Sequence, residues 1–306
     1  MTEITFLGTS AMVPTKERNV TGIYLDYKGE GILIDCGEGT QRQMNIAGIN
    51  RLKVRTILIT HWHGDHVSGL IGLIQTMGNN EKNAETGEKT KIRIFGPEGT
   101  KERMQHLLNS CVFQNKVDLD IKEINLKSPE LIFETKEYSI EAVNVKHSTP
   151  TLAYSFIEKD KRKVDMGKAG KLGLKEGPYI GKLQSGQEVM FKGKKILPDE
   201  VSKIIKGKKI VFVLDTTPCP SCIEISREAD ILIMESVYAT NMEEKADAYK
   251  HMTAQQAAQI AHQANAKKLV LTHFSQRYKT VEEIETNARD IFPESVCAFD
   301  FMKIKV

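Results

Sequence analysis

Residues 60–66 read Thr-His-Trp-His-Gly-Asp-His and follow directly after the apolar run Ile-Leu-Ile at 57–59. This short stretch contributes three imidazoles and one carboxylate, from His61, His63, Asp65 and His66. A core or an ordinary surface loop does not collect so many histidines, so we interpret the four residues as metal ligands. A loop that leaves a strand can point His61 and His63 the same way while the next residues turn onto a helix, so two metal ions can share one segment. Imidazole and carboxylate without thiolate suit zinc or another borderline divalent ion, and two metals with open positions suit hydrolysis.

Three polar residues later in the chain, His147, Asp215 and His273, stand at or just after the ends of apolar runs. Side chains at strand ends converge on one edge of a layered α/β fold. Each residue taken alone would more often be a capped or surface residue. Together with the cluster at 61–66, the three are predicted to be further metal ligands.

The hydrophobic pattern predicts a layered α/β architecture. Short apolar runs bounded by turn residues indicate strands, and helical composition after glycine turns or N-cap residues indicates helices. The expected strands are 4–7, 22–26, 32–35, 55–60, 91–95, 117–124, 139–145, 152–157, 210–214, 231–234 and 268–272. The expected helices are 38–47, 70–77, 97–109, 221–227, 253–264 and 281–291.

The pattern of strands and helices is interrupted at residues 158–195, where lysines and glycines replace the apolar periodicity. We expect a segment that cannot bury a core of its own and that projects as a flexible basic arm or loop. The predicted division is a first core part at 1–157, the inserted arm at 158–195, and a second core part at 196–306. Composition alone leaves two interpretations of the arm, a solvated surface insertion or a phosphate-binding element.

The composition fits a globular protein but does not decide its partner. The chain has 306 residues, 40% of them hydrophobic, and a net charge of +3, which neither demands nor excludes a nucleic acid. Its five scattered cysteines favour reduced thiols in the cytoplasm rather than disulfides. No apolar run approaches the roughly 18 residues of a membrane helix, so no membrane partner is expected.

The His-x-His-x-Asp-His segment and the three later ligands resemble the pattern of the metallo-β-lactamase superfamily. The resemblance spans nearly the whole chain and implies an αββα sandwich. The ligand sets that it implies are His61, His63 and His147 for one metal ion and Asp65, His66 and His273 for the other, with Asp215 bridging both. It leaves the reaction open, because this scaffold hydrolyses thioesters, lactams, lactones, sulfates and phosphodiesters.

Two loops are similar to those of ribonuclease Z, the family of endonucleases that process the 3′ end of tRNA. Residues 14–19, Pro-Thr-Lys-Glu-Arg-Asn, match that family's Pro-x-Lys-x-Arg-Asn loop, and residues 177–189 resemble the Gly-Pro…Gly-Lys-Leu…Gly…Val signature of its flexible arm. In short-form enzymes this exosite grips the tRNA body, commonly for the active site of the other subunit of a homodimer. The substrate contacts that the resemblance implies are Lys16, Arg18, Asn19, Gly177, Pro178, Gly181 and Lys182, with the basic side chains near phosphates.

Two segments near the C-terminus add to this resemblance. Residues 271–278 resemble the family's Leu-Thr-His-x-Ser-x-Arg-Tyr motif, in which Ser275 and Arg277 would contact phosphate or brace the loop. Residues 251–253 resemble its His-x-Thr segment, with His251 as an acid–base residue, Glu235 orienting it, and Thr253 as a helix N-cap. Without the resemblance, His251 would more often be a surface residue.

The sequence departs from the family pattern in three places. Met234 stands where many members have a histidine before the glutamate, which puts any support from that histidine in doubt. Leu214 replaces the usual glycine before the aspartate, which should affect only packing. Cys219 and Cys222 form a lone Cys-x-x-Cys, a weak signal for redox or metal function against small buried or turn residues.

The resemblance implies an endoribonuclease with two zinc ions per subunit, or manganese or another divalent ion, that removes the 3′ trailer from precursor tRNA. Water would attack the phosphorus, Asp65 would accept its proton, and His251 would protonate the leaving 3′ oxygen. The products would be a 3′-hydroxyl on the tRNA and a 5′-phosphate on the trailer. Three alternatives are a thioesterase or lactonase, which has no need of the two basic loops, a non-catalytic RNA-binding relative, which would have lost ligands, and a flavin or diiron redox protein, for which no flavin domain follows.

Overall fold

The computed structural model describes residues 2–79 and 89–306. The chain forms two compact units. Unit 1 comprises Met1–Phe133, Ile140–Phe156 and Lys209–Val306, and unit 2 comprises Glu134–Ser139 and Ile157–Lys208. All the sequence-predicted metal ligands belong to unit 1.

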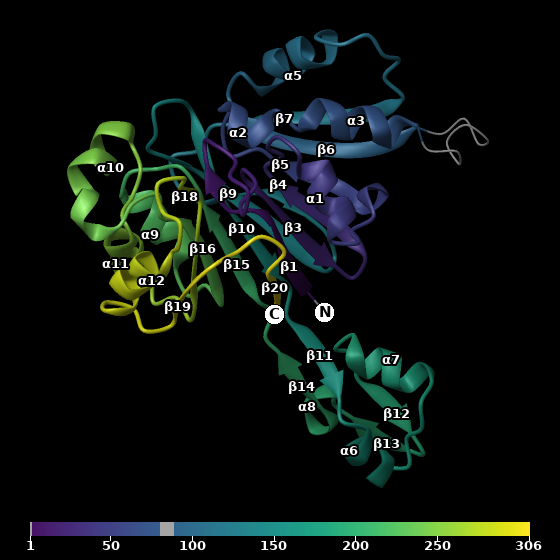
Figure 1. The fold of residues 1–306 in the computed structure, drawn as a ribbon. Coiled ribbons are helices and arrows are strands. Elements are labelled where there is room, and N and C mark those ends of the chain that lie inside the picture. The colour runs from purple at the N-terminus through teal and green to yellow at the C-terminus, as the bar shows by residue number, and fades with distance from the viewer. Residues whose placement is uncertain (1, 80–88) are drawn as a thin grey trace. The chain divides into compact units, whose positions relative to one another are not determined.

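Two seven-stranded sheets form the body of unit 1 (Figure 1). The first sheet has the order β20-β1-β3-β4-β5-β6-β7 and the second has the order β19-β17-β16-β15-β10-β9-β8. The strands of the first sheet are β1 (Thr2–Gly8), β3 (Gly22–Tyr27), β4 (Glu30–Ile34), β5 (Val54–Leu58), β6 (Thr90–Pro97), β7 (Val117–Ile124) and β20 (Lys303–Lys305). Those of the second are β8 (Glu130–Glu134), β9 (Tyr138–Val145), β10 (Thr151–Glu158), β15 (Lys209–Val213), β16 (Ile231–Glu235), β17 (Leu269–Thr272) and β19 (Ser295–Cys297). A parallel pair of short strands, β2 (Ser10–Ala11) and β18 (Phe274–Ser275), lies near the ligand-bearing ends.

Direct contacts join the two sheets. The buried hydroxyl of Tyr154 on β10 donates a 2.7 Å hydrogen bond to the carbonyl of Ile59, just beyond β5. The backbone N–H of Leu152 donates to the carbonyl of Thr60 at 2.9 Å, at the start of the histidine cluster. The second sheet therefore fixes the exact place where the ligand segment leaves the first.

Helices cover the outer faces of both sheets, which makes unit 1 an αββα sandwich (Figure 1). The helices beside the first sheet are α1 (Thr40–Ile46), α2 (Gly64–Val67), α3 (Leu70–Gly78) and α5 (Thr100–Asn109). Those beside the second are α9 (Pro220–Ser226), α10 (Glu243–Tyr249), α11 (Ala254–Gln263) and α12 (Glu282–Arg289). Buried apolar side chains join each helical layer to its sheet, such as Leu73 of α3 with Ile57, and Ala258 of α11 with Leu271. The predicted fold class is confirmed.

The strands and helices predicted in the two core parts are found within a few residues of their expected bounds. The predicted N-cap is also confirmed, because Thr253 and Gln256 form a capping box at the start of α11. Six strands and α-helices in the described part of unit 1 were missed, namely β2, β8, α10, β18, β19 and β20. Of these, β2 and β18 have two residues and β19 and β20 have three, while β8 has no fully buried residue and α10 buries only Ala246. None therefore carries a full hydrophobic period.

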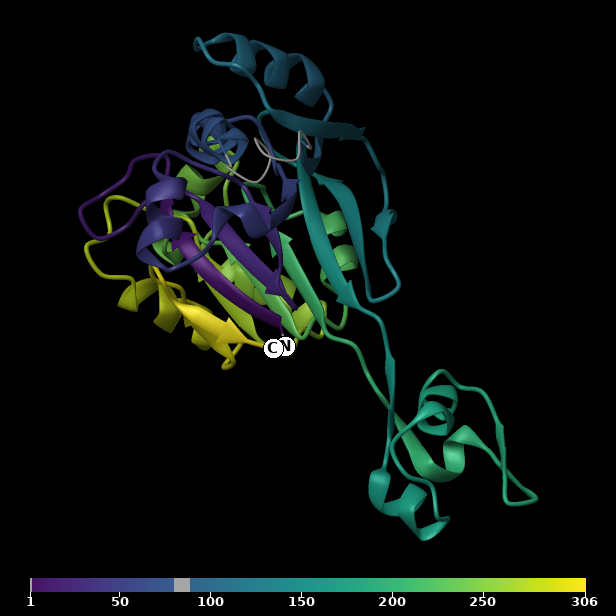
Figure 2. The ribbon, with the colours of Figure 1, turned by 90° about the vertical axis from the view of Figure 1, so that its right-hand side faces the viewer.

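The first and last described residues are paired in unit 1 (Figure 2). The N–H of Val306 donates to the carbonyl of Thr2 at 2.9 Å, and β1 pairs with β20 antiparallel. Among residues 2–79 and 89–306, no helix combines the length and the apolar character needed to cross a membrane.

Unit 2 has a small hydrophobic core, so the expectation that this segment buries none was wrong. Its buried side chains are Val164, Ala169, Leu174, Leu183, Val189, Ile196 and Val201. They lie far apart in the sequence, with no more than one in any strand or helix and Leu174 between two helices, and therefore leave no visible periodicity. Its elements are β11 (Lys161–Val164), α6 (Met166–Lys171), α7 (Pro178–Gln184), β12 (Val189–Phe191), β13 (Lys194–Ile196), α8 (Pro198–Val201) and β14 (Ser202–Ile205).

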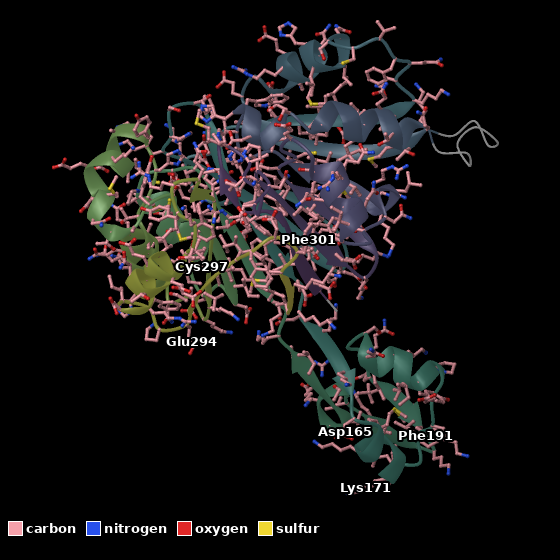
Figure 3. All side chains as sticks on the ribbon, viewed as in Figure 1. Asp165, Lys171, Phe191, Glu294, Cys297 and Phe301 are labelled. Atoms are coloured by element: carbon pink, nitrogen blue, oxygen red, sulfur yellow. The ribbon has the colours of Figure 1, made fainter. Side chains whose placement is uncertain are left out.

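The pairing of β11 with β14 extends unit 2 beyond the predicted arm at 158–195. Asp165 caps α6 by accepting hydrogen bonds from the N–H groups of Gly167 and Lys168, at 2.9 and 3.1 Å. Lysines such as Lys171 remain on its surface, as the side chains of unit 2 in Figure 3 show. The segment is thus folded around a few apolar residues and keeps its basic exterior.

Candidate metal centre and active site

The sequence-predicted ligands leave the sheets at strand ends and meet in unit 1. His61 and His63 follow β5, and Asp65 and His66 lie on the short helix α2. The remaining ligands follow β9, β15 and β17, in the order His147, Asp215 and His273. Because these strand ends open on the same edge of the sandwich, residues more than 200 positions apart converge there.

One group of ligand atoms comes from His61, His63, His147 and Asp215, and all four atoms lie within 4.8 Å of one another. His63 Nδ1 is 2.9 Å from His61 Nε2 and 3.3 Å from His147 Nε2. Asp215 Oδ2 is 3.5 Å from His61 Nε2. Three imidazole nitrogens and one carboxylate oxygen facing a common point form a donor set of the kind that binds zinc.

A second group comes from Asp65, His66 and His273. Its His66 Nε2 lies 3.4 Å from Asp65 Oδ2, and its His273 Nε2 lies 3.0 Å from the other oxygen of Asp215, Oδ1. The two oxygens of Asp215 therefore face different groups. This is the arrangement that a bridging carboxylate requires.

Two atoms at the second group, one of His66 and one of the bridging Asp215, need a partner. His66 Nε2 and Asp215 Oδ1 are buried and make no hydrogen bond to any described residue. An unsatisfied buried polar atom costs about 1–3 kcal/mol, and more when it is charged. A divalent cation between these atoms would satisfy both, so the residues present fit a metal ion.

The ligand rings are held from behind by residues that orient them. Asp35, fully buried at the end of β4, accepts a hydrogen bond from His66 Nδ1 at 2.7 Å and others from the backbone and hydroxyl of Thr60 at 2.8 and 2.7 Å. Thr21 Oγ1 lies 2.7 Å from His273 Nδ1, and the carbonyl of Lys250 lies 2.8 Å from His147 Nδ1. Each contact occupies Nδ1 and leaves Nε2 for a metal.

Sequence reasoning missed Asp35 as a functional residue and treated it as the end of a strand. The available signal was an aspartate closing the apolar run 32–34, which is the same pattern that identified Asp215. The backbone carries a second signal. Asp35, Asp215 and His273 have φ values of 56°, 39° and 60°, which for non-glycine residues cost about 1–3 kcal/mol each and cluster at functional sites.

The electrostatics of the cluster favour a cation. Burial opposes ionisation of Asp215, but the surrounding imidazoles of His273, His66 and His61 outweigh it and hold its pKa well below the usual range. Burial, followed by the charge of His66, lowers the pKa of His61. The carboxylates that would hold a proton on His66 can equally hold a divalent ion in its place.

His251 lies beside the metal-binding groups and is held by Glu235. His251 Nδ1 is 3.2 Å from both oxygens of Glu235, a fully buried residue that also accepts from the N–H groups of Thr216 and Met252. Burial lowers the pKa of His251, but the charge of Glu235 outweighs this effect and raises it to about 9. The two residues form the dyad that the resemblance implied, although their catalytic role stays a prediction. Asp215, His251 and His273 form a third group of potential ligand atoms. The Nδ1 of His251 lies 3.9 Å from Asp215 Oδ2 but only 3.2 Å from Glu235, so we assign His251 to proton transfer and not to metal binding.

Met234 points away from this dyad. Successive side chains of a strand face opposite sides, and Met234 of β16 packs in the core under α11 while Glu235 faces the cluster. A histidine at this position of this strand would lie in that core and not among the ligands.

Cys219 and Cys222 belong to none of the groups of potential ligands found among the described residues. Their Sγ atoms are 3.4 Å apart at the start of α9, and the contact with Cys222 lowers the pKa of Cys219 to about 6. Cys222 is fully buried in the core behind the second sheet.

The structure places the predicted substrate residues in three different settings. Arg18 is nearly buried, and its guanidinium donates to the carbonyls of Tyr278 and Ser275 at 2.6 and 3.4 Å, so it braces the loop after His273. Asn19 donates to the carbonyl of Glu38, and Lys16 is exposed. Gly177, Pro178, Gly181 and Lys182 lie in unit 2, at the start and along α7.

A cavity of about 1290 Å³ opens over the metal-binding groups. Its walls include Asp65, His147 and His251, together with Ser275 and Arg277 from the last ligand loop. The cavity is large enough for more than one nucleotide. The arrangement as a whole can therefore hold two cations beside a histidine that carries a proton, under an open cleft.

An αββα sandwich with this ligand set defines a metal-dependent hydrolase of the metallo-β-lactamase fold. The ribonuclease Z of Methanothermobacter thermautotrophicus is 41% identical over 307 residues, covering 100% of this chain and 97% of the relative. That of Pyrococcus horikoshii is 42% identical over 308 residues, covering 100% and 96%. The chain belongs to the ribonuclease Z family.

Two further comparisons concern the fold and the first half of the chain. The crystal structure of the short form of human tRNase Z has a TM-score of 0.72 and 26% identity, with 99% of each chain covered. The model of a family described as "Anti-Pycsar protein Apyc1" matches residues 2–164, which groups the first half of the chain with that family. That match includes the predicted ligands from His61 to His147 but ends before Asp215 and His273. The ribonuclease Z relatives span the entire site.

Proposed function

We propose that this protein is an endoribonuclease that hydrolyses the phosphodiester bond at the 3′ end of the tRNA part of precursor tRNA. It releases the 3′ trailer with a 5′-phosphate and leaves a 3′-hydroxyl on the tRNA. The observation that carries the proposal is the pair of ligand groups joined by Asp215, in a chain that matches ribonucleases Z along its whole length. A thioesterase or lactonase could share the ligands, but nothing in the cleft favours it.

We propose zinc as the resident metal, two ions per subunit, with manganese or another divalent ion as a substitute. One would be held by His61, His63 and His147, the other by Asp65, His66 and His273, and Asp215 would contact both. Bound there, the ions lower the pKa of water and neutralise charge on the phosphoryl oxygens. Neutral imidazoles and ionised carboxylates are the states that such ligands require.

The chain's own residues then handle protons. Asp65 accepts the proton of the attacking water, and its Oδ2 is held by a 2.8 Å hydrogen bond from the N–H of Met12. His251 carries a proton near neutral pH and gives it to the departing 3′ oxygen. Glu235 is the positioning residue, since it fixes Nδ1 of His251 and leaves Nε2 for the substrate.

We further propose that the lysine-rich unit 2 binds the tRNA body, through residues that include Lys182 of α7. Contacts from lysine to phosphate are independent of sequence and weaken with salt, which suits an enzyme that accepts many tRNAs. Lys16 would contact phosphate nearer the scissile bond. By analogy with short-form relatives, we propose a homodimer in the cytoplasm in which unit 2 serves the other subunit's active site.

Cleavage of a 3′-extended precursor tRNA by the purified protein with zinc or manganese tests this function, with Asp65→Ala as the control. We expect a cut at the end of the tRNA part that disappears in the variant. Intact precursor together with rapid hydrolysis of a thioester or lactone would retain the fold and overturn the substrate.

A further inference from the structure

The wall of the cleft that contains His251 also has an exposed aromatic residue, Tyr249, to which the proposed reaction gives no role. Tyr249 ends α10 and keeps 61% of its surface exposed, and it lines the same cavity as Asp65 and His147. A tyrosine with this much exposed surface next to a metal centre is available to a ligand. Its apolar ring and polar hydroxyl suit a flat, partly polar partner.

Cationic side chains surround this tyrosine and its neighbour. Lys245 Nζ lies 5.9 Å from the ring centre of Tyr249 and 6.0 Å from that of Tyr238. The guanidinium carbon of Arg277 lies 5.5 Å from the ring centre of Tyr238. Aromatic faces interleaved with cations are the features by which proteins bind single-stranded nucleic acid, with rings for the bases and charges for the phosphates.

Backbone contacts fix Tyr249 relative to the metal site. The next residue, Lys250, ends the helix with a φ of 62°, and its carbonyl lies 2.8 Å from Nδ1 of the ligand His147. The N–H of His251 donates to the carbonyl of Ala246, one turn back in α10, at 2.9 Å. The tyrosine is therefore carried by the same turn that positions the proton donor and a ligand.

We propose that Tyr249 is a stacking platform for the base of the last nucleotide that stays on the tRNA, and that Lys245 and Arg277 neutralise the adjoining phosphates. This inference rests on the proposed function. Since His251 protonates the 3′ oxygen of that nucleotide, the turn that carries both Tyr249 and His251 lies on the retained side of the scissile bond. Stacking accepts any base, so the platform orients the substrate without selecting its sequence.

Three precursors test the proposal: one intact, one lacking the base of the last retained nucleotide, and one lacking the base of the first trailer nucleotide. With the wild-type protein, loss of the retained base should lower kcat/KM roughly 5- to 150-fold, the factor that corresponds to one stacked base. Tyr249→Ala should lose the same factor on the intact precursor and lose nothing further when the retained base is absent. Tyr249→Phe and Tyr249→Trp should keep the dependence on that base, because stacking needs the ring and not the hydroxyl.

Phe299→Ala is a matched control, since Phe299 is 63% exposed and does not line the cavity. It should behave as the wild type on all three precursors. The proposal is overturned if Tyr249→Ala remains sensitive to the retained base, or if only the trailer base removes the effect of the substitution. Failure of the wild type to cut any precursor would overturn the proposed function as well. Cleavage of all three precursors with the same kcat/KM would overturn the stacking platform alone.

Discussion

Replacement of Asp35 by asparagine tests whether the ligand geometry depends on residues behind the ligands. Asp35 Oδ1 accepts from the N–H of Thr60, and Oδ2 accepts from the hydroxyl of Thr60 and from His66 Nδ1. The amide of asparagine has one acceptor oxygen, so Asp35→Asn can accept either the hydrogen bond made to Oδ1 or those made to Oδ2, but not both. If its oxygen takes the place of Oδ2, a donor faces the N–H of Thr60 and one hydrogen bond to a charged group is lost, which costs about 1.5–3 kcal/mol.

The other orientation of the amide acts on the metal. Its N–H would then face His66 Nδ1 and favour the tautomer with the proton on Nε2, the atom that points at the second ligand group. Loss of such an orienting partner typically weakens metal binding about 10–100-fold. Both orientations therefore harm the protein, one through folding and the other through the metal.

The assay is a zinc titration of the metal-free protein against a competing chelator, together with urea unfolding of the same samples. We expect Asp35→Asn to weaken the second zinc and to lower the free energy of unfolding. Asp118→Asn, at an exposed aspartate on β7, is the matched control and should change neither. Wild-type affinity for both ions and an unfolding free energy unchanged in Asp35→Asn would refute the reasoning.

Three further predictions follow from the same structure. Glu235→Gln removes the charge that raises the pKa of His251 to about 9, so burial should then lower that pKa. Because His251 would lose its proton at lower pH, the alkaline limb of the kcat/KM profile for precursor tRNA should move to lower pH. An unmoved limb would exclude the dyad. Residues 159–207 can be replaced by a short glycine linker because a 2.8 Å hydrogen bond already joins the N–H of Glu158 to the carbonyl of Lys208. This deletion should leave hydrolysis of methyl p-nitrophenyl phosphate intact and abolish tRNA cleavage. Retained tRNA cleavage would contradict the proposal that unit 2 binds tRNA. Chelation should lower the melting temperature and zinc should restore it, because a ligand at 100 times its Kd adds about 2.7 kcal/mol to the stability of the folded state; a melting curve insensitive to both would argue against bound metal.

The ligand cluster could be predicted from the sequence because each ligand follows a strand whose apolar pattern is clear. The run 57–59 locates His61, and similar runs locate Asp215 and His273. Parallel strands end on the same edge of a sheet, which brings together Asp215 and His273 after β15 and β17. His61 follows a strand of the other sheet, and its place beside these two residues was predicted from the resemblance. The pairing of Glu235 with His251 was predicted from resemblance, and the structure brings the two side chains together.

Other features depend on contacts that leave no local pattern. The role of Asp35 becomes clear only from its hydrogen bond with His66. Arg18 was expected near phosphate, and in the structure its guanidinium donates to backbone carbonyls of the loop after His273. The core of unit 2 consists of apolar residues spread thinly over 164–201, so that tertiary packing alone reveals it. The exposed Tyr249 belongs to a polar helix without a hydrophobic period, and its place in the cleft depends on the turn that follows.

Titration of the metal-free protein with zinc, while cleavage of a precursor tRNA is followed and the product ends are mapped, tests the central claim most directly. We predict no cleavage without metal, activity that rises until about two zinc ions are bound per chain, and products with a 3′-hydroxyl on the tRNA and a 5′-phosphate on the trailer. Full cleavage by the metal-free protein, or cuts scattered through the tRNA body, would contradict it.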